Sequence, residues 1–216
     1  MRRKLLSFIV LAAMFATYSG YLNVGTNGIV DTANAATTSS VQTIMLYVTS
    51  TITLTLATST VNLGTLTPGT AITGNTSLTV VTNEYTGWNL QVKRDDGDST
   101  LDLDADGSVN FPDATAWNYS SPNATTSPEV GANLSFRVLN TGTDAALYNS
   151  SWWGTDDTAP NALYAGFPAT NQQIATVASY VGATQNVAYG FRADAPGTQQ
   201  SGQYTGTVTF TAITNL

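Results

Sequence analysis

A long alternation of apolar and polar residues limits the fold more than any other feature of this sequence. From position 44 to position 56 the even residues read Ile, Leu, Val, Ser, Ile, Leu and Leu, and Thr fills the odd positions from Thr49 onward. A period of two is typical of a β-strand that buries one face. The run is about twice as long as an ordinary strand of five or six residues. We therefore expect two collinear strands that divide near Ser50, the first of them a separate element.

Shorter alternating runs recur along the rest of the chain. They lie at 61–66, 77–82, 88–92, 134–138, 187–192 and 204–213. Trp88, Leu90 and Val92 point to one side of their strand, which places Trp88 at the centre of the core. Ser and Thr make up a quarter of the 216 residues, a bias that suits exposed strand faces. The sequence predicts an all-β fold: a single antiparallel Ig-like or pilin-like β-sandwich with long inserted loops.

The first 35 residues have the composition of an export signal. Arg2, Arg3 and Lys4 precede an apolar run from 5 to 15, and Ala33 and Ala35 are small residues at the spacing of a signal-peptidase site. The apolar run is too short to span a bilayer. We therefore expect a signal peptide over 1–35 and a β-sandwich domain over 36–216. The mature chain, without a transmembrane segment, would be secreted and extracellular at the cell surface.

The sparse charges argue against several function classes. The formal charge is -7, and beyond the N-terminus only Lys93, Arg94, Arg137 and Arg192 are basic, too few to neutralise a nucleic-acid backbone. The chain has no Cys and no His, which removes Ser-His and Cys-His nucleophiles and His-bearing zinc sites. No Gly-rich phosphate loop follows a strand. We expect a protein that is not an enzyme.

An acidic stretch at 102–113, inside an insertion at about 93–133, has the spacing of a calcium loop. Calcium takes six to eight oxygen ligands, and a twelve-residue loop supplies them from positions one, three, five, seven, nine and twelve, with Gly at six. The matching residues are Asp102, Asp104, Asp106, Ser108, Asn110 and Asp113, with Gly107 at the turn. Without a cation these carboxylates would repel one another. The alternative is a solvated turn in an acid-rich region.

Two further stretches are candidate partner-binding surfaces. Trp152 and Trp153 are adjacent, so on an extended segment they point in opposite directions, and one would be exposed beside Asp156 and Asp157. That Trp could stack on a sugar ring, or the segment could be a lid over the end of the sandwich.

The other stretch is the first part of the long alternation. Ile44, Leu46 and Val48 form an apolar, uncharged row that needs a cover. It could fold back as an edge strand of its own sandwich or insert into a neighbouring subunit, which would generate filaments.

Three resemblances accompany these features. The loop at 102–113 resembles the EF-hand loop in its dockerin variant, which implies the ion and its ligands. The stretch Gly87-Trp88-Asn89-Leu90 and the strand Tyr204-Thr205-Gly206-Thr207-Val208-Thr209-Phe210 are similar to the two signatures of WxL domains, which attach proteins to Gram-positive cell walls; Phe210 stands where that family has Trp. The overall layout looks like that of pilin-like and coat-like subunits, in several of which an N-terminal strand completes the neighbour.

The expected function is therefore a secreted, calcium-stabilised structural subunit of a filament or surface layer that self-associates. The alternative is a module that binds cell-wall polysaccharide.

Overall fold

The computed structural model describes residues 39–127 and 131–215. The predicted signal peptide over 1–35 lies outside these ranges. The chain divides into two units, Met1–Tyr47 and Val48–Leu216. In the first unit, residues 39–47 have no regular secondary structure, and the strands among the described residues belong to the second unit.

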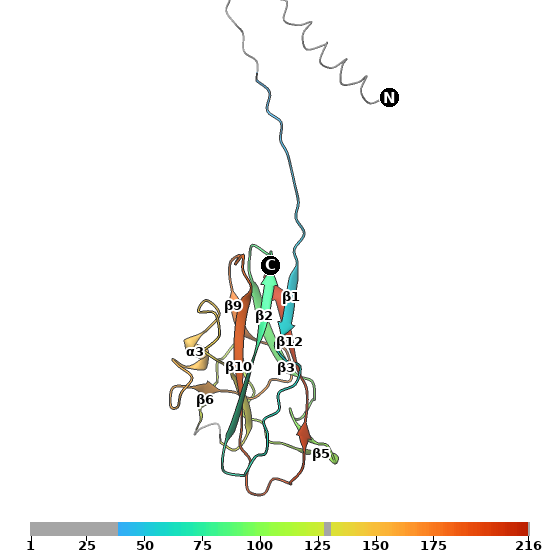
Figure 1. Ribbon diagram of the computed structural model, residues 1–216, viewed down its shortest axis with the longest axis vertical. Helices are drawn as coiled ribbons and strands as arrows, with labels where there is room; N and C mark the ends of the chain where they lie inside the picture. Colours follow the sequence, from blue (N-terminus) through green and yellow to red (C-terminus); the bar gives the residue numbers. More distant parts are fainter. Residues whose placement is uncertain (1–38, 128–130, 216) are drawn as a thin grey trace, which may run out of the picture. The chain divides into compact units, whose positions relative to one another are not determined.

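Nearly all the regular secondary structure described in the second unit is antiparallel strand, joined by long loops, which confirms the predicted all-β fold (Figure 1). The strands of the described part of the chain, with the short helix α3, are β1 Ile52–Leu56, β2 Ile72–Thr82, β3 Trp88–Arg94, β4 Asp102–Leu103, β5 Asp106–Asn110, β6 Thr125–Thr126, β7 Leu134–Val138, α3 Ser150–Trp153, β8 Leu163–Tyr164, β9 Gln172–Val177, β10 Gln185–Ala193, β11 Tyr204–Thr205 and β12 Val208–Thr214. No helix among the described residues is long and apolar enough to cross a membrane.

Two sheets carry the core. One has the strand order β1-β2-β10-β7 and the other has the order β12-β3-β9. The end strands β1 and β12 come near each other without pairing, and they lie side by side in Figure 1. The sandwich therefore has two sides. We call the side bounded by β1 and β12 the open side, and the side bounded by β7 and β9 the closed side.

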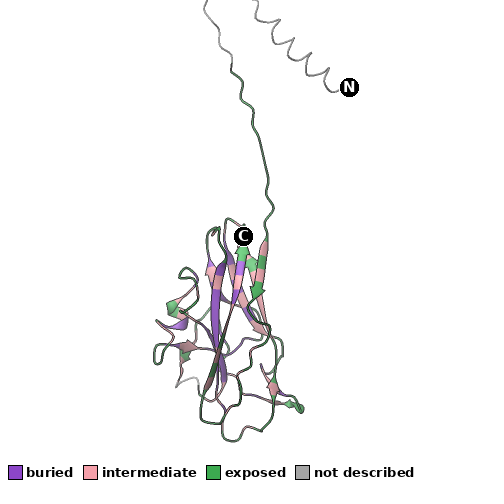
Figure 2. Cartoon of the chain, viewed as in Figure 1, coloured by how far each residue is buried: buried purple, intermediate pink, exposed green. Residues whose placement is uncertain are grey.

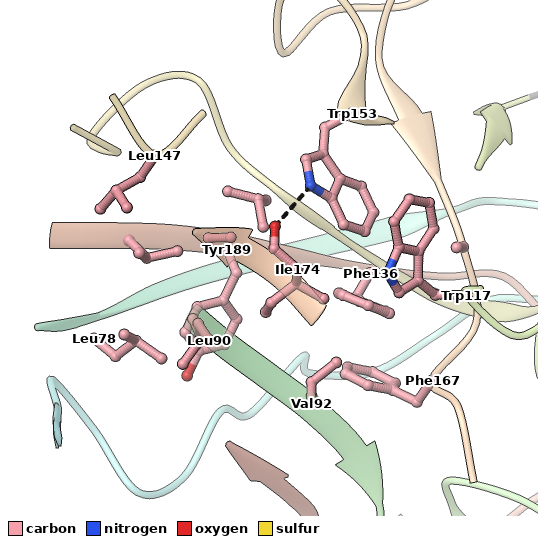
Figure 3. Packing of buried hydrophobic residues seen from close by; sticks show 14 of the residues in the cluster. Leu78, Leu90, Val92, Trp117, Phe136, Leu147, Trp153, Phe167, Ile174 and Tyr189 are labelled. Atoms are coloured by element: carbon pink, nitrogen blue, oxygen red, sulfur yellow. Dashed lines mark hydrogen bonds between the residues drawn. The ribbon is translucent and has the colours of Figure 1, made fainter. Parts of the chain in front are cut away.

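The core between the sheets follows the alternation that the sequence shows. Trp88, Leu90 and Val92 are buried on β3, as predicted, and Leu78 and Val80 are buried on β2. The Trp88 indole donates to Gln185 Oε1 on the opposite sheet at 2.6 Å, so the one polar atom of this ring is satisfied inside the core. Figure 3 shows the cluster, in which Phe136 and Phe167 stack with their centroids 4.3 Å apart.

Several strands differ from their predicted bounds. Residues 61–66 form no strand, although Leu63 and Leu66 still pack against the core. The predicted strand at 77–82 begins earlier, at Ile72, and the one at 88–92 ends later, at Arg94. Strand β9 was not predicted. The long terminal strand is divided into β11 and β12. At the division, a Cβ on Gly206 would lie 1.8 Å from the Thr100 carbonyl oxygen, so the two segments pass at a distance that only glycine allows.

The long alternation at 44–56 also differs in part. Strand β1 covers only Ile52–Leu56, and residues 39–51 are not part of any strand. The second of the two expected strands is therefore confirmed as β1, whereas the first, before Ser50, does not form; the boundary between the two units falls close to Ser50.

Candidate functional site

The closed side of the sandwich is covered by the chain itself. The outer edge of β7 exchanges hydrogen bonds with the inserted segments: Phe136 N–H donates to Ala165 O at 2.8 Å, and Ala165 N–H donates back to Phe136 O at 3.0 Å. Leu134 N–H donates to Pro112 O at 2.7 Å. The unpaired backbone groups of an end strand would otherwise attract another chain. At β7 this edge is satisfied within the molecule.

Two Trp side chains cover the neighbouring end strand, β9. The Trp117 indole donates to Gln173 O at 2.7 Å, and the Trp153 indole donates to Ile174 O at 3.2 Å. Both rings are buried and lie 4.6 Å apart between centroids. Figure 3 shows the Trp153 ring pointing at Ile174.

This arrangement corrects the expectation for the Trp pair. The segment is the helix α3 and not an extended chain, because the Asn149 side chain caps its first turn by accepting from Ser151 N–H. Adjacent residues on a helix do not point in opposite directions. Trp153 is fully buried, so it cannot be a partner-facing residue. Trp152 is half-buried, and it packs edge-on against Tyr119 at 5.4 Å.

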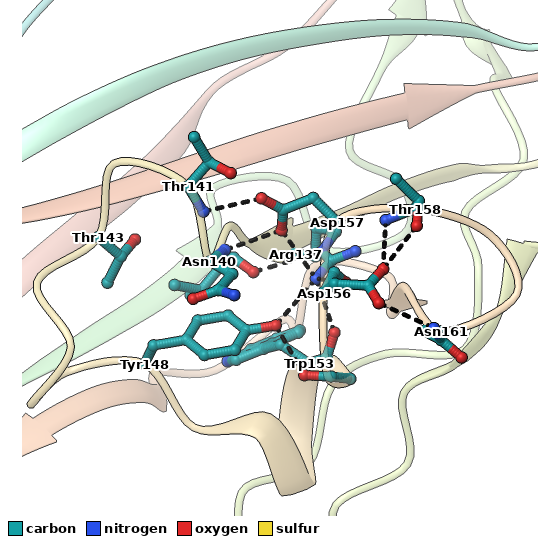
Figure 4. A network of polar contacts seen from close by, with 12 residues as sticks. Arg137, Asn140, Thr141, Thr143, Tyr148, Trp153, Asp156, Asp157, Thr158 and Asn161 are labelled. Atoms are coloured by element: carbon teal, nitrogen blue, oxygen red, sulfur yellow. Dashed lines mark hydrogen bonds and ion pairs between the residues drawn. The ribbon is translucent and has the colours of Figure 1, made fainter.

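A buried arginine fixes the loop that follows α3 (Figure 4). Arg137 is 0% exposed, and its Nη2 donates to the carbonyl oxygens of Trp153 and Asp156 at 2.8 and 2.9 Å. It also forms an ion pair with Asp157 at 3.1 Å. Burial opposes ionisation of Asp157, but N–H bonds from Thr141 and Asn140 and the Arg137 charge outweigh it, so the pKa of Asp157 lies below its ordinary value. The loop is thus a lid that is bound to the sandwich.

A small cavity lies beside this lid. Its volume is about 210 Å³, and Tyr148, Asn149, Trp152 and Thr176 are among its lining residues. Tyr119 is 42% exposed. A partly exposed aromatic pair next to polar groups is the kind of surface on which a sugar ring can stack.

The predicted calcium ligands lie on and around the β4–β5 hairpin. Asp102 pairs with Asn110, and Leu103 pairs with Asp106. Each carboxylate has its own partner: Asp102 accepts from Ser99 Oγ at 2.6 Å, and Asp104 accepts from Thr205 Oγ1 at 2.5 Å. Asp106 accepts from Ser108 N–H and Oγ, and the pKa of Asp106 is lowered by these bonds. No three acidic side chains of residues 39–127 and 131–215 form one group.

Asp113, the last predicted ligand, is paired with a protein cation. Its Oδ2 accepts from Arg94 Nη1 at 2.9 Å and from Thr100 N–H at 2.8 Å, while its Oδ1 is buried without a partner. Burial raises the pKa of Asp113, although Thr100 and Arg94 act in the opposite direction. Arg94 therefore already supplies the positive charge that a cation would bring to this carboxylate. The hairpin brings Asp102 beside Asn110 and Asp106 beside Ser108 but does not gather three of the acidic ligands among the described residues, and calcium binding stays a prediction.

The open side differs from the closed side in its backbone and in its side chains. In the described part of the chain no strand pairs with the outer edge of β1 or of β12. Asp95 N–H donates to Thr207 O, and Asn215 N–H donates to Gly87 O, so the odd residues of β12 bond to β3. Bonding alternates along an antiparallel pair. The N–H and C=O groups of Val208, Phe210 and Ala212 consequently point to the free edge.

The side chains of Val208, Phe210 and Ala212 form an apolar row that is only half-buried. Val208, Phe210 and Ala212 pair with Arg94, Val92 and Leu90, which puts their side chains on the core face of the sheet. They pack against the core yet remain partly exposed. On the facing sheet, Ile52 and Leu54 of β1 are half-buried in the same way. Figure 2 shows the contrast between β1 and the mostly buried β10.

The segment before β1 carries several of the most exposed apolar side chains among the described residues. Ile44 is 88% exposed, Leu46 84% and Val48 77%. Val41, Met45 and Tyr47 are also exposed, and no charged residue lies between 39 and 48. The structure thus exposes the row that the sequence singled out.

Asn83 fixes the backbone at the start of β1. Its side-chain Oδ1 accepts from Thr51 N–H at 2.7 Å, and its Nδ2 donates to Thr49 O at 2.9 Å. The carboxamide therefore continues the pairing between β1 and β2 by two residues beyond the strand. A tight turn at 49–51, which would return the chain along β1, would have to break these bonds.

The chain matches no protein-family model, and neither curated sequences nor solved structures gave a match to it.

Proposed function

We propose that this protein is a secreted, non-catalytic structural subunit of the cell surface that self-associates through residues 41–48 into an extracellular filament. One observation carries the proposal: Ile44, Leu46 and Val48 are apolar, uncharged and exposed. Full burial of three such side chains is worth roughly 5 to 9 kcal/mol. A strand of this kind binds by pairing with the free edge of another sheet.

Geometry favours a neighbouring copy over the same chain as the partner. The Asn83 bonds to Thr49 and Thr51 oppose a hairpin at the start of β1. A segment that inserts head to tail into the next copy does not close on itself, so the product is an open filament. Monomeric proteins normally avoid extended, uncharged strands with a free edge. The exposed row of Ile44, Leu46 and Val48 is therefore better explained by assembly with another copy.

Deletion of residues 36–47 tests the proposal. The shortened chain keeps Thr49 and Thr51 with their Asn83 bonds, so it should fold with an unchanged melting temperature. It should sediment as a monomer at concentrations at which the full chain forms filaments in electron micrographs. A synthetic peptide of residues 36–50 should bind to the shortened chain. If the intact secreted protein remains a monomer at high concentration, the filament function is wrong.

A second candidate is a module that binds cell-wall polysaccharide. It is supported by the Tyr119 and Trp152 pair beside the cavity. The residues that resemble WxL signatures do not support it directly, because Trp88 is 1% exposed and contributes to the core. Binding of the purified protein to cell walls, and its loss in Trp152→Ala with Trp152→Phe as control, would favour this candidate.

A further inference from the structure

The open side offers a site whose dimensions match the exposed segment. Strand β12 has seven residues, Val208–Thr214, and none of them is charged. The segment 41–48 has eight uncharged residues. Strand rise is nearly constant, so two segments of this length can pair along their whole extent.

The backbone groups of β12 are available in the right places. Four residues, Val208, Phe210, Ala212 and Thr214, direct their N–H and C=O groups to the free edge, as the bonding of Thr207 and Asn215 establishes. No backbone group in residues 39–127 or 131–215 bonds to them from that side. An incoming strand would satisfy these groups without breaking a backbone hydrogen bond between described residues of the subunit.

The side chains of the two strands also complement each other. The half-buried row of Val208, Phe210 and Ala212 faces the core, and Ile52 and Leu54 approach it from β1. A strand paired with β12 projects every second side chain to that same face. Ile44, Leu46 and Val48 have this spacing, so they would cover the half-buried row and fill the open side.

The edge of β1 is a less suitable acceptor. It has five residues against seven, and Leu56, at its C-terminal end, is already 41% exposed. Nor does β9 compete, because Trp117 and Trp153 bond to its outward carbonyl oxygens. β7 is likewise bonded to Ala165 and Pro112.

From these observations we infer that residues 41–48 of one copy pair with the free edge of β12 in the next copy and complete its core on the open side. The inference rests on the proposed self-association and adds the acceptor strand. The row of Ile44, Leu46 and Val48 enters the core, and Met45 and Tyr47 stay on the solvent face of the lengthened sheet.

Disulfide trapping tests the acceptor, because the chain has no cysteine of its own. Met45 and Thr211 lie at the centres of their segments, so Met45→Cys in one copy and Thr211→Cys in another come close in either strand direction. Paired strands lie about 4.8 Å apart, within the range that a disulfide spans. The matched control is Gln173→Cys, since Thr211 and Gln173 both pair with Gln91 from opposite edges of one sheet.

Each variant is expressed as the full chain with its own N-terminal 35 residues, and the secreted product is purified. One partner carries a C-terminal tag, so that a mixed dimer differs in mass from a symmetric one. After mild oxidation, the mixture of Met45→Cys with Thr211→Cys should yield a mixed dimer in at least about tenfold excess over the mixture with Gln173→Cys.

The remaining outcomes separate the two proposals. If the Cys-free protein assembles but neither mixture is trapped, or if Gln173→Cys is trapped as well as Thr211→Cys, the β12 assignment is wrong and self-association stands. If the Cys-free protein does not assemble and no mixed dimer forms, both fail.

Discussion

The closed side and the open side of this sandwich differ in how their end strands, and the core between those strands, are covered. Every sheet ends in strands with unpaired backbone groups, and a sandwich has a core that must be covered where the sheets end. On the closed side the insertions supply backbone bonds to β7 and two buried Trp rings against β9. On the open side the outer edges of β1 and β12 have no strand partner in the described ranges, and the apolar rows of these strands remain half-buried.

The difference separates stability within the subunit from association between subunits. A side that is covered by its own chain contributes to folding whether or not another copy is present. A side that leaves Val208, Phe210 and Ala212 half-buried gains its remaining burial only when a partner arrives. Substitutions on the closed side should therefore act on folding, and substitutions on the open side should act mainly on assembly.

The largest expected effect is on the closed side. Trp153→Ala removes a fully buried ring and its bond to Ile174 O, and should lower the free energy of unfolding by about 3 to 5 kcal/mol. Phe210→Ala on the open side removes a half-buried ring, so its cost in the monomer should be about 1 to 2 kcal/mol. Urea denaturation of the chain that lacks residues 36–47 measures both without interference from assembly. Equal losses would remove the distinction between the sides.

Calcium should act near the open side, because the β4–β5 hairpin pairs with β11, which leads into β12. If the spacing of Asp102, Asp104 and Asp106 does hold the ion, calcium at a hundred times its dissociation constant stabilises the fold by about 2.7 kcal/mol. Isothermal calorimetry and thermal melts measure the binding and the stabilisation.

Asp104→Ala should abolish this effect. The control is Asp95→Ala. Asp95 is an exposed acid that lies outside the loop and accepts a hydrogen bond from Thr209. No heat of binding and no change in melting temperature would identify the loop as a solvated hairpin.

The sequence predicts the central strands well and the covering segments poorly, for a physical reason. Trp88, Leu90 and Val92 alternate because one face of β3 is buried and the other is not, so their row is visible in the sequence. Strand β9 begins with Gln172 and Gln173, and its apolar residues follow one another, so it shows little alternation. The burial of Trp153 depends on the Asn149 cap and on contacts with residues far along the chain.

The polar sites are the least predictable from the sequence. The spacing of the four Asp residues shows which carboxylates are present but does not determine the direction in which their oxygens point. In the folded hairpin each carboxylate has a separate hydrogen-bond partner. Arg137 lies in a strand in which all five residues are buried. The residues around it in the sequence give no pattern that predicts its ion pair with Asp157. The exposed row at 44–48, by contrast, can be predicted from the sequence, because the alternation at 44–56 is longer than one strand of a sandwich.

Part of the pH dependence of stability should originate on the closed side. The folded-state pKa of Asp157 is lowered, so its contribution is present above the unfolded pKa near 3.9 and is lost as the pH falls through the lower folded value. Asp157→Asn should therefore lower stability at pH 7 and reduce the loss between pH 5 and pH 2. Denaturation at several pH values measures this. A wild-type profile that the substitution leaves unchanged would show that the Arg137 network does not contribute to acid sensitivity.

The smallest effect on the monomer should come from a proline on the open edge. The Ala212 N–H points to the free edge of β12 and has no backbone partner in the described residues, so Ala212→Pro removes no bond within the subunit. Proline is tolerated on edge strands where its nitrogen faces solvent, and the shortened monomer should lose no more than about 1 kcal/mol. In the full chain the same change removes a donor that the incoming strand requires, so filaments should be lost. Thr211→Pro is the control, because its nitrogen faces β3; it should destabilise the monomer by about 3 kcal/mol. Filaments that persist in Ala212→Pro would place the incoming strand elsewhere than β12, and a monomer that Thr211→Pro leaves intact would show that the two residues have been assigned the wrong edges.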